Sequence, residues 1–270
     1  MSLLRKVVKT FLLILHILTF ISFLGVIHLF FKKNPTIRLK VITWALCLFN
    51  KITRLLLGIK VKITGKRSVL RKRGLFFVCN HLSYLDGIVT SSLSPLVFIG
   101  KSELKRWPIL GMMVSLSGTI FVNRINPVNI RRELRKITRI LNSGVNVILF
   151  PEGTSGSGRA LLPFKSSFFA APIETGCYVV PLAIRYTQIN SQKVTEENKD
   201  YVYWYGDMEL VPHLFGVLGL KSIEVEIKVC NPVYIPENYR RENTSFHRKR
   251  ISQISKRIIE ESIKCADLEL

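Results

Sequence analysis

The chain has 270 residues, a formal net charge of +22 and 48% hydrophobic residues. A chain of this length suits one sizeable α/β domain with appended segments, because single cores stop growing near ~250–300 residues. Nucleic-acid-binding proteins are also basic but rarely combine that charge with long apolar runs, so the composition favours an anionic lipid surface. The five cysteines show no CxxC or Cys/His metal spacing, and we expect reduced thiols and no metal site.

Residues 11–31 form the first recognisable element, an apolar run without Asp, Glu, Lys or Arg. About 20 apolar residues cover the core of a bilayer. A cleaved signal peptide is the alternative, but its apolar region would be about 7–15 residues long and would end in small residues. Basic residues flank both ends of the run, which favours a cytosolic location for the rest of the chain. We expect a helix in the cytoplasmic (inner) membrane, with entry into only one leaflet as an alternative to crossing.

Residues 39–57 mix apolar side chains with lysine and arginine. This pattern predicts an amphipathic helix at the membrane interface, with Trp44 at headgroup level, although an ordinary core-facing helix fits equally well. We therefore divide the chain into a membrane segment, residues 1–57, and a second domain, residues 58–270, which ends in an amphipathic helix.

From residue 74 onward, short apolar runs alternate with amphipathic segments. The alternation predicts an α/β fold with a mostly parallel sheet flanked by helices. The expected strands are 61–64, 75–79, 97–99, 119–122, 145–150, 179–185 and 223–229. The expected helices lie near 84–92, 108–116, 128–142, 164–175 and 246–265. Residues 187–221 break the rhythm and resemble an insertion after a strand.

The expected helix 128–142 is strongly basic. Arg131, Arg135 and Arg139 are spaced four residues apart, so they share one face of the helix. A solvated face is the simpler interpretation of such a stripe. A surface that faces a membrane or another anion is the alternative.

His81 is the strongest candidate for proton transfer. It follows an apolar strand, and ligands of open α/β sheets bind where strands end. Asp86 is five residues further on, and on one continuous helix the two side chains would point about 140° apart. They can meet only if His81 lies on the turn and the first helical turn brings Asp86 back. Asp86 would then orient the imidazole, which would deprotonate a substrate hydroxyl directly.

A glycine-rich turn follows a second apolar strand, at residues 152–158. Its sequence fits neither a Walker A loop nor G-x-S-x-G. It is rich in backbone donors and is followed by Lys165 at the expected start of a helix, a suitable place for an anion. Glu152 would repel phosphate, so we expect it to accept hydrogen bonds from the acceptor's hydroxyls or to support the turn. A glycine-rich surface loop without a function remains the alternative.

Four blocks in chain order carry a resemblance to a known family. They are Asn80-His81-x4-Asp86, Gly118-Thr119-Ile120-Phe121-Val122-Asn123-Arg124, Phe150-Pro151-Glu152-Gly153-Thr154 and Val180-Pro181-Leu182-Ala183. Any single block is weak, but all four in this order and spacing, within residues 58–235, resemble the lysophospholipid acyltransferases, the glycerolipid acyltransferases with a PlsC-type domain. The resemblance implies a glycerolipid acyltransferase-like fold.

The resemblance also implies roles for individual residues. His81 is the general base and Asp86 its partner. The implied acceptor-site residues are Arg124, Glu152, Gly153 and Thr154, with Lys101 and Lys165 as further cations. The implied reaction moves a fatty acyl group from acyl-CoA or acyl-ACP to the free hydroxyl of a lysolipid, without a metal or redox cofactor.

The first expectation for the acceptor is 1-acyl-sn-glycerol-3-phosphate, which would give phosphatidate. Ser155 departs from this pattern, because many phosphatidate-forming members have an arginine there, and its loss removes a bidentate phosphate clamp. Lys165 and Arg159 could compensate. The later segment Trp204-Tyr205-Gly206-Asp207 resembles a branch that includes lyso-ornithine-lipid acyltransferases, so another lysolipid of that kind is the alternative acceptor.

Two other classes of function fit parts of the sequence. A serine hydrolase or thioesterase would use Ser83 or Ser155 as nucleophile, but no strained elbow motif presents either residue. A non-enzymatic basic protein bound to membranes would explain the charge and leave His81, Asp86 and Glu152 without a role. No nucleic-acid-binding module is visible, and we expect a lysolipid, a thioester donor and an anionic membrane surface as partners.

Overall fold

A single mixed sheet forms the centre of the molecule. The computed structural model describes residues 2–107, 109–122, 127–240 and 244–268. Within these residues the sheet has eight strands, in the order β1-β8-β6-β2-β5-β3-β4, with β7 paired to β6. The strands are β1 (Ile59–Gly65), β2 (Phe76–Cys79), β3 (Leu96–Lys101), β4 (Ile120–Val122), β5 (Asn146–Leu149), β6 (Val179–Ile189), β7 (Gln192–Lys193) and β8 (Ile223–Val229).

Strands β2 to β6 run parallel to one another, as the alternation of elements predicts. β8 pairs antiparallel with β6 and parallel with β1. Strand β2 lies near the middle and is buried along its whole length. Phe76 and Val78 join one hydrophobic cluster, whereas Phe77 and Cys79 join the other. Both faces of β2 are therefore covered, which explains why its sequence is an uninterrupted apolar run.

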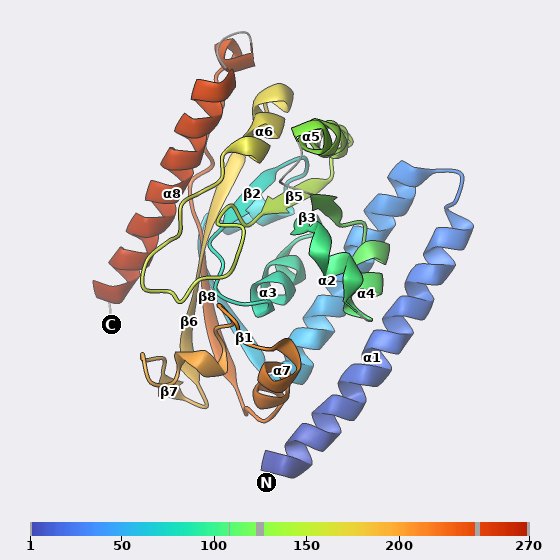
Figure 1. Cartoon of the computed structure of the whole chain (residues 1–270), viewed down its shortest axis with the longest axis vertical. Coiled ribbons are helices and arrows are strands. Elements are labelled where there is room, and N and C mark those ends of the chain that lie inside the picture. The colour runs from blue at the N-terminus through green and yellow to red at the C-terminus, as the bar shows by residue number, and fades with distance from the viewer. Residues whose placement is uncertain (1, 108, 123–126, 241–243, 269–270) are drawn as a thin grey trace.

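Helices cover both faces of the sheet (Figure 1). One face carries α5 (Pro127–Asn142), α6 (Ala170–Thr175) and α8 (Thr244–Leu268). The other face carries α3 (Leu85–Leu93) and α7 (Leu210–Leu218), with α2 (Pro35–Leu57) packed against α3 and α1 (Ser2–Phe30) outermost. The short α4 (Leu110–Leu116) lies beside α1.

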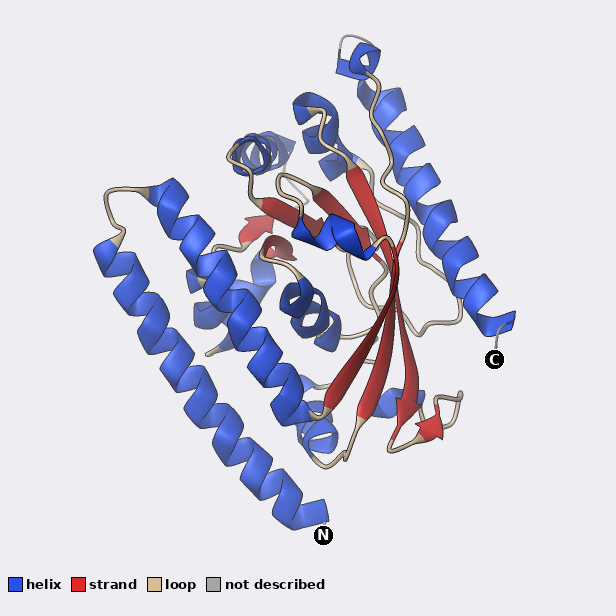
Figure 2. Ribbon diagram, turned by 180° about the vertical axis from the view of Figure 1, so that it is seen from behind, coloured by secondary structure: helices blue, strands red, loops and turns tan. Residues whose placement is uncertain are grey.

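The first two helices form an antiparallel hairpin, which both views show side by side (Figures 1 and 2). Asn34 caps α2 by accepting the Ile37 N–H at 3.1 Å, and Pro35 occupies the first turn, where a missing N–H costs nothing. The seam between the helices is apolar and includes Phe20, Leu24, Ile42, Leu46 and Phe49.

The N-terminal end of α1 is tied to the domain by its cations. Lys9 Nζ donates to the carbonyl oxygens of Leu57 at 3.1 Å and Leu220 at 2.8 Å. Arg5 donates to the Gly219 carbonyl oxygen at 2.9 Å. Both cations thus satisfy carbonyl groups at or just beyond the ends of α2 and α7, where helices favour positive charge. The hairpin therefore lies along the domain instead of projecting from it.

The outer surface of α1 is apolar and uncovered. Residues 3–30 have a mean hydropathy of 2.4 in their most apolar window, of which only 22% is buried. Large exposed side chains of this surface include Leu4, Phe11, Leu15, Leu18, Phe23 and Leu29. Exposed apolar surface of this extent marks a membrane or protein contact.

Helix α2 packs one face on the domain, where its Asn50 donates to the Ser91 hydroxyl on α3 at 2.7 Å. Its other face exposes Trp44, Leu48 and Leu55, so a position at the membrane interface stays a prediction. Two other sequence predictions need correction. The helix expected over 164–175 begins only at Ala170, after a 3₁₀ turn, and the loop before that turn is held by the Lys165 N–H, which donates to the Pro151 carbonyl oxygen. Strand β6 continues to Ile189, so the break in rhythm begins later than expected.

Candidate active site

Two turns at the same edge of the sheet build the candidate site. Strands β2 and β5 are parallel neighbours, with Val78 opposite Leu149. The turns that follow them, residues 80–84 and 150–154, therefore lie side by side, at the edge where ligands of α/β sheets bind. A backbone bond from the Gly156 N–H to the His81 carbonyl oxygen, at 2.9 Å, joins the two loops.

The structure brings His81 and Asp86 together. His81 lies on the turn, α3 begins at Leu85, and Asp86 in its first turn reaches back so that its Oδ2 is 2.9 Å from His81 Nδ1. The Asp86 side chain is fully buried, whereas the His81 side chain is 21% exposed. Because the carboxylate accepts the Nδ1–H, Nε2 carries the lone pair and can take a proton.

Four donors hold the Asp86 carboxylate in place. Besides His81, its Oδ2 accepts the backbone N–H groups of Leu82 at 2.6 Å and Ser83 at 2.9 Å. Its Oδ1 accepts the Tyr186 hydroxyl at 2.7 Å. Burial, then the charge of Asp86, raises the pKa of Tyr186 well above its usual value, so this hydroxyl stays protonated and donates. The carboxylate is thus satisfied and rigid although it is buried.

The imidazole plane is held by an aromatic neighbour. The Phe150 ring stacks on His81 with centroids 4.4 Å apart and an interplanar angle of 25°. Phe98 stacks behind Phe150 in the same orientation. These contacts and the Asp86 hydrogen bond together leave the ring little freedom to rotate.

Glu152 bridges the two turns through backbone groups. Its Oε1 accepts the His81 N–H at 2.8 Å and its Oε2 accepts the Leu162 N–H at 2.9 Å. The side chain is 4% exposed, and burial raises its pKa while these two hydrogen bonds oppose the rise. Of the two roles expected for Glu152, these contacts favour support of the turn over a direct contact with the acceptor.

Gly153 and Thr154 complete the turn after β5. The Gly153 N–H donates to the Phe150 carbonyl oxygen at 3.1 Å, and its φ of 78° is one that other residues rarely adopt. Thr154 is exposed beside it, and Ser155 is buried. Arg159 pairs with Glu196 at 3.1 Å on the surface, so its contact here is with a carboxylate.

The further cations predicted from the sequence lie outside the His81–Asp86 pair. Lys101 is exposed at the end of β3. Lys165 is exposed on the loop before the 3₁₀ turn Ser167–Phe169, and not at the start of a helix as expected. Arg124 lies outside the described residues, so its predicted contact with the acceptor's phosphate stays a prediction.

Sequence reasoning assigned no role to two residues of the site, although Asn80 stands in the first of the four blocks. Asn80 acts as a backbone substitute where β2 ends: its side chain donates to the Ile184 carbonyl oxygen at 3.0 Å and accepts the Ile184 N–H at 2.8 Å. Tyr186 is the other. The one signal for it was a tyrosine within a buried strand, since a buried hydroxyl needs a partner.

An aromatic cluster lies beside the turn that carries His81. Tyr84 donates to His213 Nδ1 at 3.0 Å, and His213 Nε2 donates to the Tyr203 carbonyl oxygen at 2.8 Å. Burial lowers the pKa of His213, which fits a neutral ring with one donor and one acceptor nitrogen. The backbone N–H of Trp204 donates to the Leu82 carbonyl oxygen at 2.9 Å, which ties the segment after Lys199 to the turn.

The serine residues are poorly placed for covalent chemistry. The Ser83 side chain is completely buried, and its hydroxyl oxygen accepts the Leu85 N–H at 3.4 Å. Ser155 is 6% exposed. A nucleophile must reach its substrate, so the site is suited to a base that activates an external hydroxyl.

Comparisons with known proteins agree with this chemistry. The sequence profile of the Acyltransferase family matches residues 60–185. The lyso-ornithine lipid O-acyltransferase of Rhizobium meliloti (strain 1021) is 38% identical over 66% of this chain and 63% of its own length. That of Brucella abortus (strain 2308) is 35% identical over 69% of this chain and 72% of its own length. The 1-acyl-sn-glycerol-3-phosphate acyltransferase of Neisseria gonorrhoeae is 33% identical over 62% of this chain and 63% of its own length.

The matches thus span less than two thirds of the Rhizobium and Neisseria proteins and more than two thirds of the Brucella protein. The crystal structure of the 1-acyl-sn-glycerophosphate (LPA) acyltransferase PlsC from Thermotoga maritima covers 96% of this chain and 95% of its own, with a TM-score of 0.64 at 22% identity. That likeness confirms the predicted fold. From the sequence matches, the chain belongs to the acyltransferase family that includes the lyso-ornithine lipid and 1-acyl-sn-glycerol-3-phosphate acyltransferases.

Proposed function

We propose that this chain is a membrane-bound O-acyltransferase that moves a fatty acyl group from a thioester donor to the free hydroxyl of a lysolipid. One observation carries the proposal: an accessible imidazole, oriented by a buried carboxylate 2.9 Å away, lies at the ligand-binding edge of the sheet. Membership of the acyltransferase family supports it.

In the proposed step, His81 Nε2 takes the proton of the lysolipid hydroxyl while the hydroxyl oxygen attacks the thioester carbonyl carbon. The new C–O bond forms, the C–S bond breaks, and the imidazolium returns the proton to the leaving thiolate. Asp86 holds the Nδ1–H and stabilises the imidazolium in between. The buried Ser83 favours this direct transfer over an acyl-enzyme.

The acceptor is a lysolipid, and we rank lyso-ornithine lipid ahead of 1-acyl-sn-glycerol-3-phosphate. An ornithine headgroup carries no phosphate, so it needs no clamping arginine at the position of Ser155. Arg159, which could compensate, is paired with Glu196. The Rhizobium and Brucella relatives are lyso-ornithine lipid acyltransferases. The Neisseria relative keeps 1-acyl-sn-glycerol-3-phosphate as the second candidate.

The α1–α2 hairpin supplies the membrane contact in this proposal. Its α1 face is apolar and exposed, and the N-terminal turn of α1 is held against the domain by Arg5 and Lys9. A helix fixed along the side of a domain can bury its outer face in one leaflet. Location at the cytoplasmic membrane, with the domain facing the cytosol, stays a prediction.

A panel of acceptors tests the proposed function. Membranes containing the chain would be supplied with radiolabelled acyl-CoA and, side by side, with lyso-ornithine lipid, lysophosphatidate and other lysophospholipids. We expect labelled diacylated product with at least one lysolipid, and most from lyso-ornithine lipid. Membranes without the chain give the background.

Two results would contradict the proposal. The first is a lack of product from every lysolipid with both acyl-CoA and acyl-ACP as donors. The second is release of free fatty acid together with labelling of the chain by a fluorophosphonate, which would indicate a serine hydrolase.

A further inference from the structure

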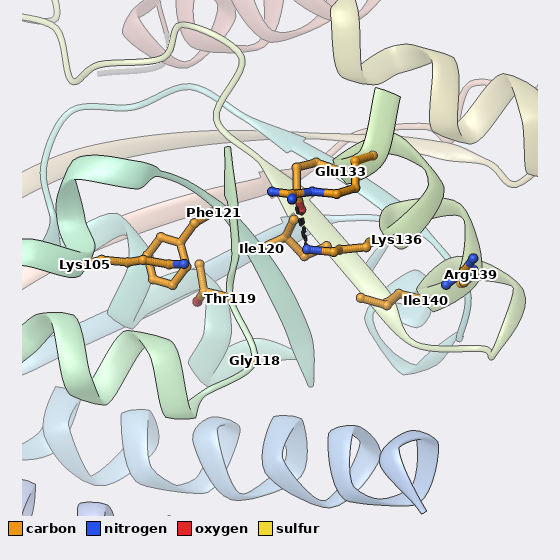
Figure 3. A pocket seen from close by; sticks show the side chains of 10 residues that line it. Lys105, Gly118, Thr119, Ile120, Phe121, Glu133, Lys136, Arg139 and Ile140 are labelled. Carbon is orange, nitrogen blue, oxygen red and sulfur yellow. Dashed lines mark hydrogen bonds and ion pairs between the residues drawn. The ribbon is translucent and has the colours of Figure 1, made fainter. Parts of the chain in front are cut away.

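A cleft at the free edge of the sheet lies outside the site described above. Strand β4 is the last strand of the sheet, so one of its edges has no partner strand among the described residues. A cavity of about 400 Å³ opens between this edge, helix α5 and the segment that precedes α4 (Figure 3). Its volume is within the range of small-molecule sites. Leu39 at the start of α2 packs on Gly118 at the lower end of the cleft.

The lining of the cleft is strongly cationic. Lys105 stands on one side, and Lys136 and Arg139 stand on the other, on α5 (Figure 3). Arg132, one turn before Lys136 on the same helix, also lines the cleft. Within the described residues, four cations therefore face the cavity against one carboxylate, that of Glu133. The sequence pattern pointed to Arg131 and Arg135 with Arg139, but only Arg139 of these three lines the cleft. An exposed strand edge with converging cations is suited to phosphate groups.

Glu133 makes the cleft more than a basic patch. Its side chain is 2% exposed, and it pairs with Arg132 at 3.0 Å and Lys136 at 3.0 Å. These contacts hold the two cations in place beside the cavity.

The cleft lies at a useful distance from His81. Strands β2, β5, β3 and β4 are successive neighbours about 4.8 Å apart, so β4 lies roughly 14 Å across the sheet from β2. The pairing registers carry Ile120 across β3 and β5 to the level of Val78, three residues before His81. Three residues of strand add roughly 10 Å along the chain direction, which places His81 roughly 17 Å from Ile120. An extended arm such as pantetheine can span that separation.

We propose that the cleft between β4 and α5 binds the phosphate-bearing nucleotide of coenzyme A, so that the thioester at the far end of its pantetheine arm reaches His81. The proposal rests on the proposed acyl transfer and deepens it, since it names a coenzyme A thioester as the donor. A membrane lipid headgroup offers the same phosphate chemistry, and the experiment separates the two sources.

Binding of adenosine 3′,5′-bisphosphate to the full-length chain in detergent tests the site without any acyl transfer. The variant is Arg139→Glu, and the matched control is Arg135→Glu, which makes the same charge change at an exposed residue of α5 outside the cleft. Titration calorimetry should show binding to the wild type and the control. Arg139→Glu should bind at least about tenfold more weakly, because it loses a charge-assisted contact and adds a repulsion.

Kinetics add a second readout. For Arg139→Glu, the KM for acyl-CoA should rise about tenfold or more, whereas the KM for acyl-pantetheine, which lacks the nucleotide, should stay at the wild-type value. Equal effects of the two α5 variants, or equal effects on the two donors, would overturn the proposal. So would a wild type that does not bind the bisphosphate while Arg139→Glu selectively loses binding to anionic lipid vesicles.

The two proposals can fail separately. Selective loss of bisphosphate binding in Arg139→Glu, with no acyl transfer to any lysolipid by the wild type, would uphold the nucleotide site and overturn only the proposed function.

Discussion

At the scale of residues, the site depends on buried groups that position the two turns around His81. Asp86, Glu152 and Tyr186 are each almost fully buried, and each uses its polar atoms within the protein. Their partners are mostly backbone N–H groups, so the backbone of the turns and these side chains stabilise each other. A buried partner removed without replacement costs about 1–3 kcal/mol.

Glu152→Gln should destabilise the fold and slow acyl transfer. One amide oxygen can replace one carboxylate oxygen, but the amide NH₂ would then face a backbone N–H of His81 or Leu162. We expect the free energy of unfolding to fall by about 1–3 kcal/mol and kcat to fall with it. Glu196→Gln, an exposed carboxylate, is the control for chemical denaturation and turnover. A variant with raised KM for the lysolipid and unchanged stability would instead place Glu152 in contact with the acceptor.

Tyr186→Phe should leave Asp86 Oδ1 buried without a donor. We expect a loss of about 1–3 kcal/mol in unfolding free energy and a lower kcat with little change in either KM, because Tyr186 acts through Asp86. Tyr205→Phe removes an exposed hydroxyl that bonds Asp200, and it should change stability by less than about 0.5 kcal/mol. Wild-type kcat in Tyr186→Phe would show that this hydrogen bond does not position Asp86.

His213 should make stability depend on pH. Its folded-state pKa is lowered by burial from an ordinary value of 6.5, so the unfolded chain binds this proton more readily. The contribution of neutral His213 to the free energy of unfolding is therefore fully present above pH 6.5. It is lost as the pH falls through the folded-state pKa. His213→Gln keeps a donor for the Tyr203 carbonyl and an acceptor for Tyr84 but does not titrate. Its melting temperature should fall less than that of the wild type between pH 7 and pH 5. Parallel plots of melting temperature against pH for the two proteins would show that His213 does not cause the pH dependence.

At the scale of elements, the strands were the most predictable part of the chain. Apolar runs such as 75–79 and 145–150 could be identified because both faces of a central parallel strand are covered. Element ends were less predictable. The loop before α6 is held by a contact between the Lys165 N–H and the Pro151 carbonyl, which joins segments that the sequence pattern cannot connect.

The position of the α1–α2 hairpin was likewise not predictable from the sequence pattern. An apolar run of 21 residues without Asp, Glu, Lys or Arg predicted a helix that enters a membrane. Its orientation along the domain depends on Arg5 and Lys9 meeting the carbonyl groups of Leu57, Gly219 and Leu220, more than 45 residues away in the chain. Such contacts between distant residues leave no local pattern.

A charge on the outer face of α1 should weaken membrane binding. Leu18 is 56% exposed on α1, and Leu18→Asp would place a carboxylate among lipid chains. We expect the affinity for lipid vesicles to fall at least about tenfold. Ile254→Asp makes a similar change at an exposed position of α8 and should leave vesicle binding unchanged. Equal retention of both variants on vesicles would show that α1 is not the membrane contact.

At the scale of the whole molecule, one sheet edge brings together parts that lie far apart in the chain. Residues 80–86 follow β2, residues 150–154 follow β5, and Tyr186 comes from β6. The order of these blocks was visible in the sequence, and the meeting of His81 with Asp86 could be stated as a geometric condition. The hydrogen-bond partners of Glu152 could not be predicted from the sequence. One of them, Leu162, belongs to an irregular loop whose path only the folded chain defines.

Acyl transfer by His81→Ala in native membranes tests the proposed mechanism most directly. General-base catalysis contributes about 10²–10⁴-fold to rate, so the variant should transfer labelled acyl groups to the preferred lysolipid at least about a hundredfold more slowly. It should remain in the membrane fraction in wild-type amount, because His81 lies outside the α1–α2 hairpin. Turnover near the wild-type rate in a correctly localised His81→Ala variant would contradict the assignment of His81 as the base.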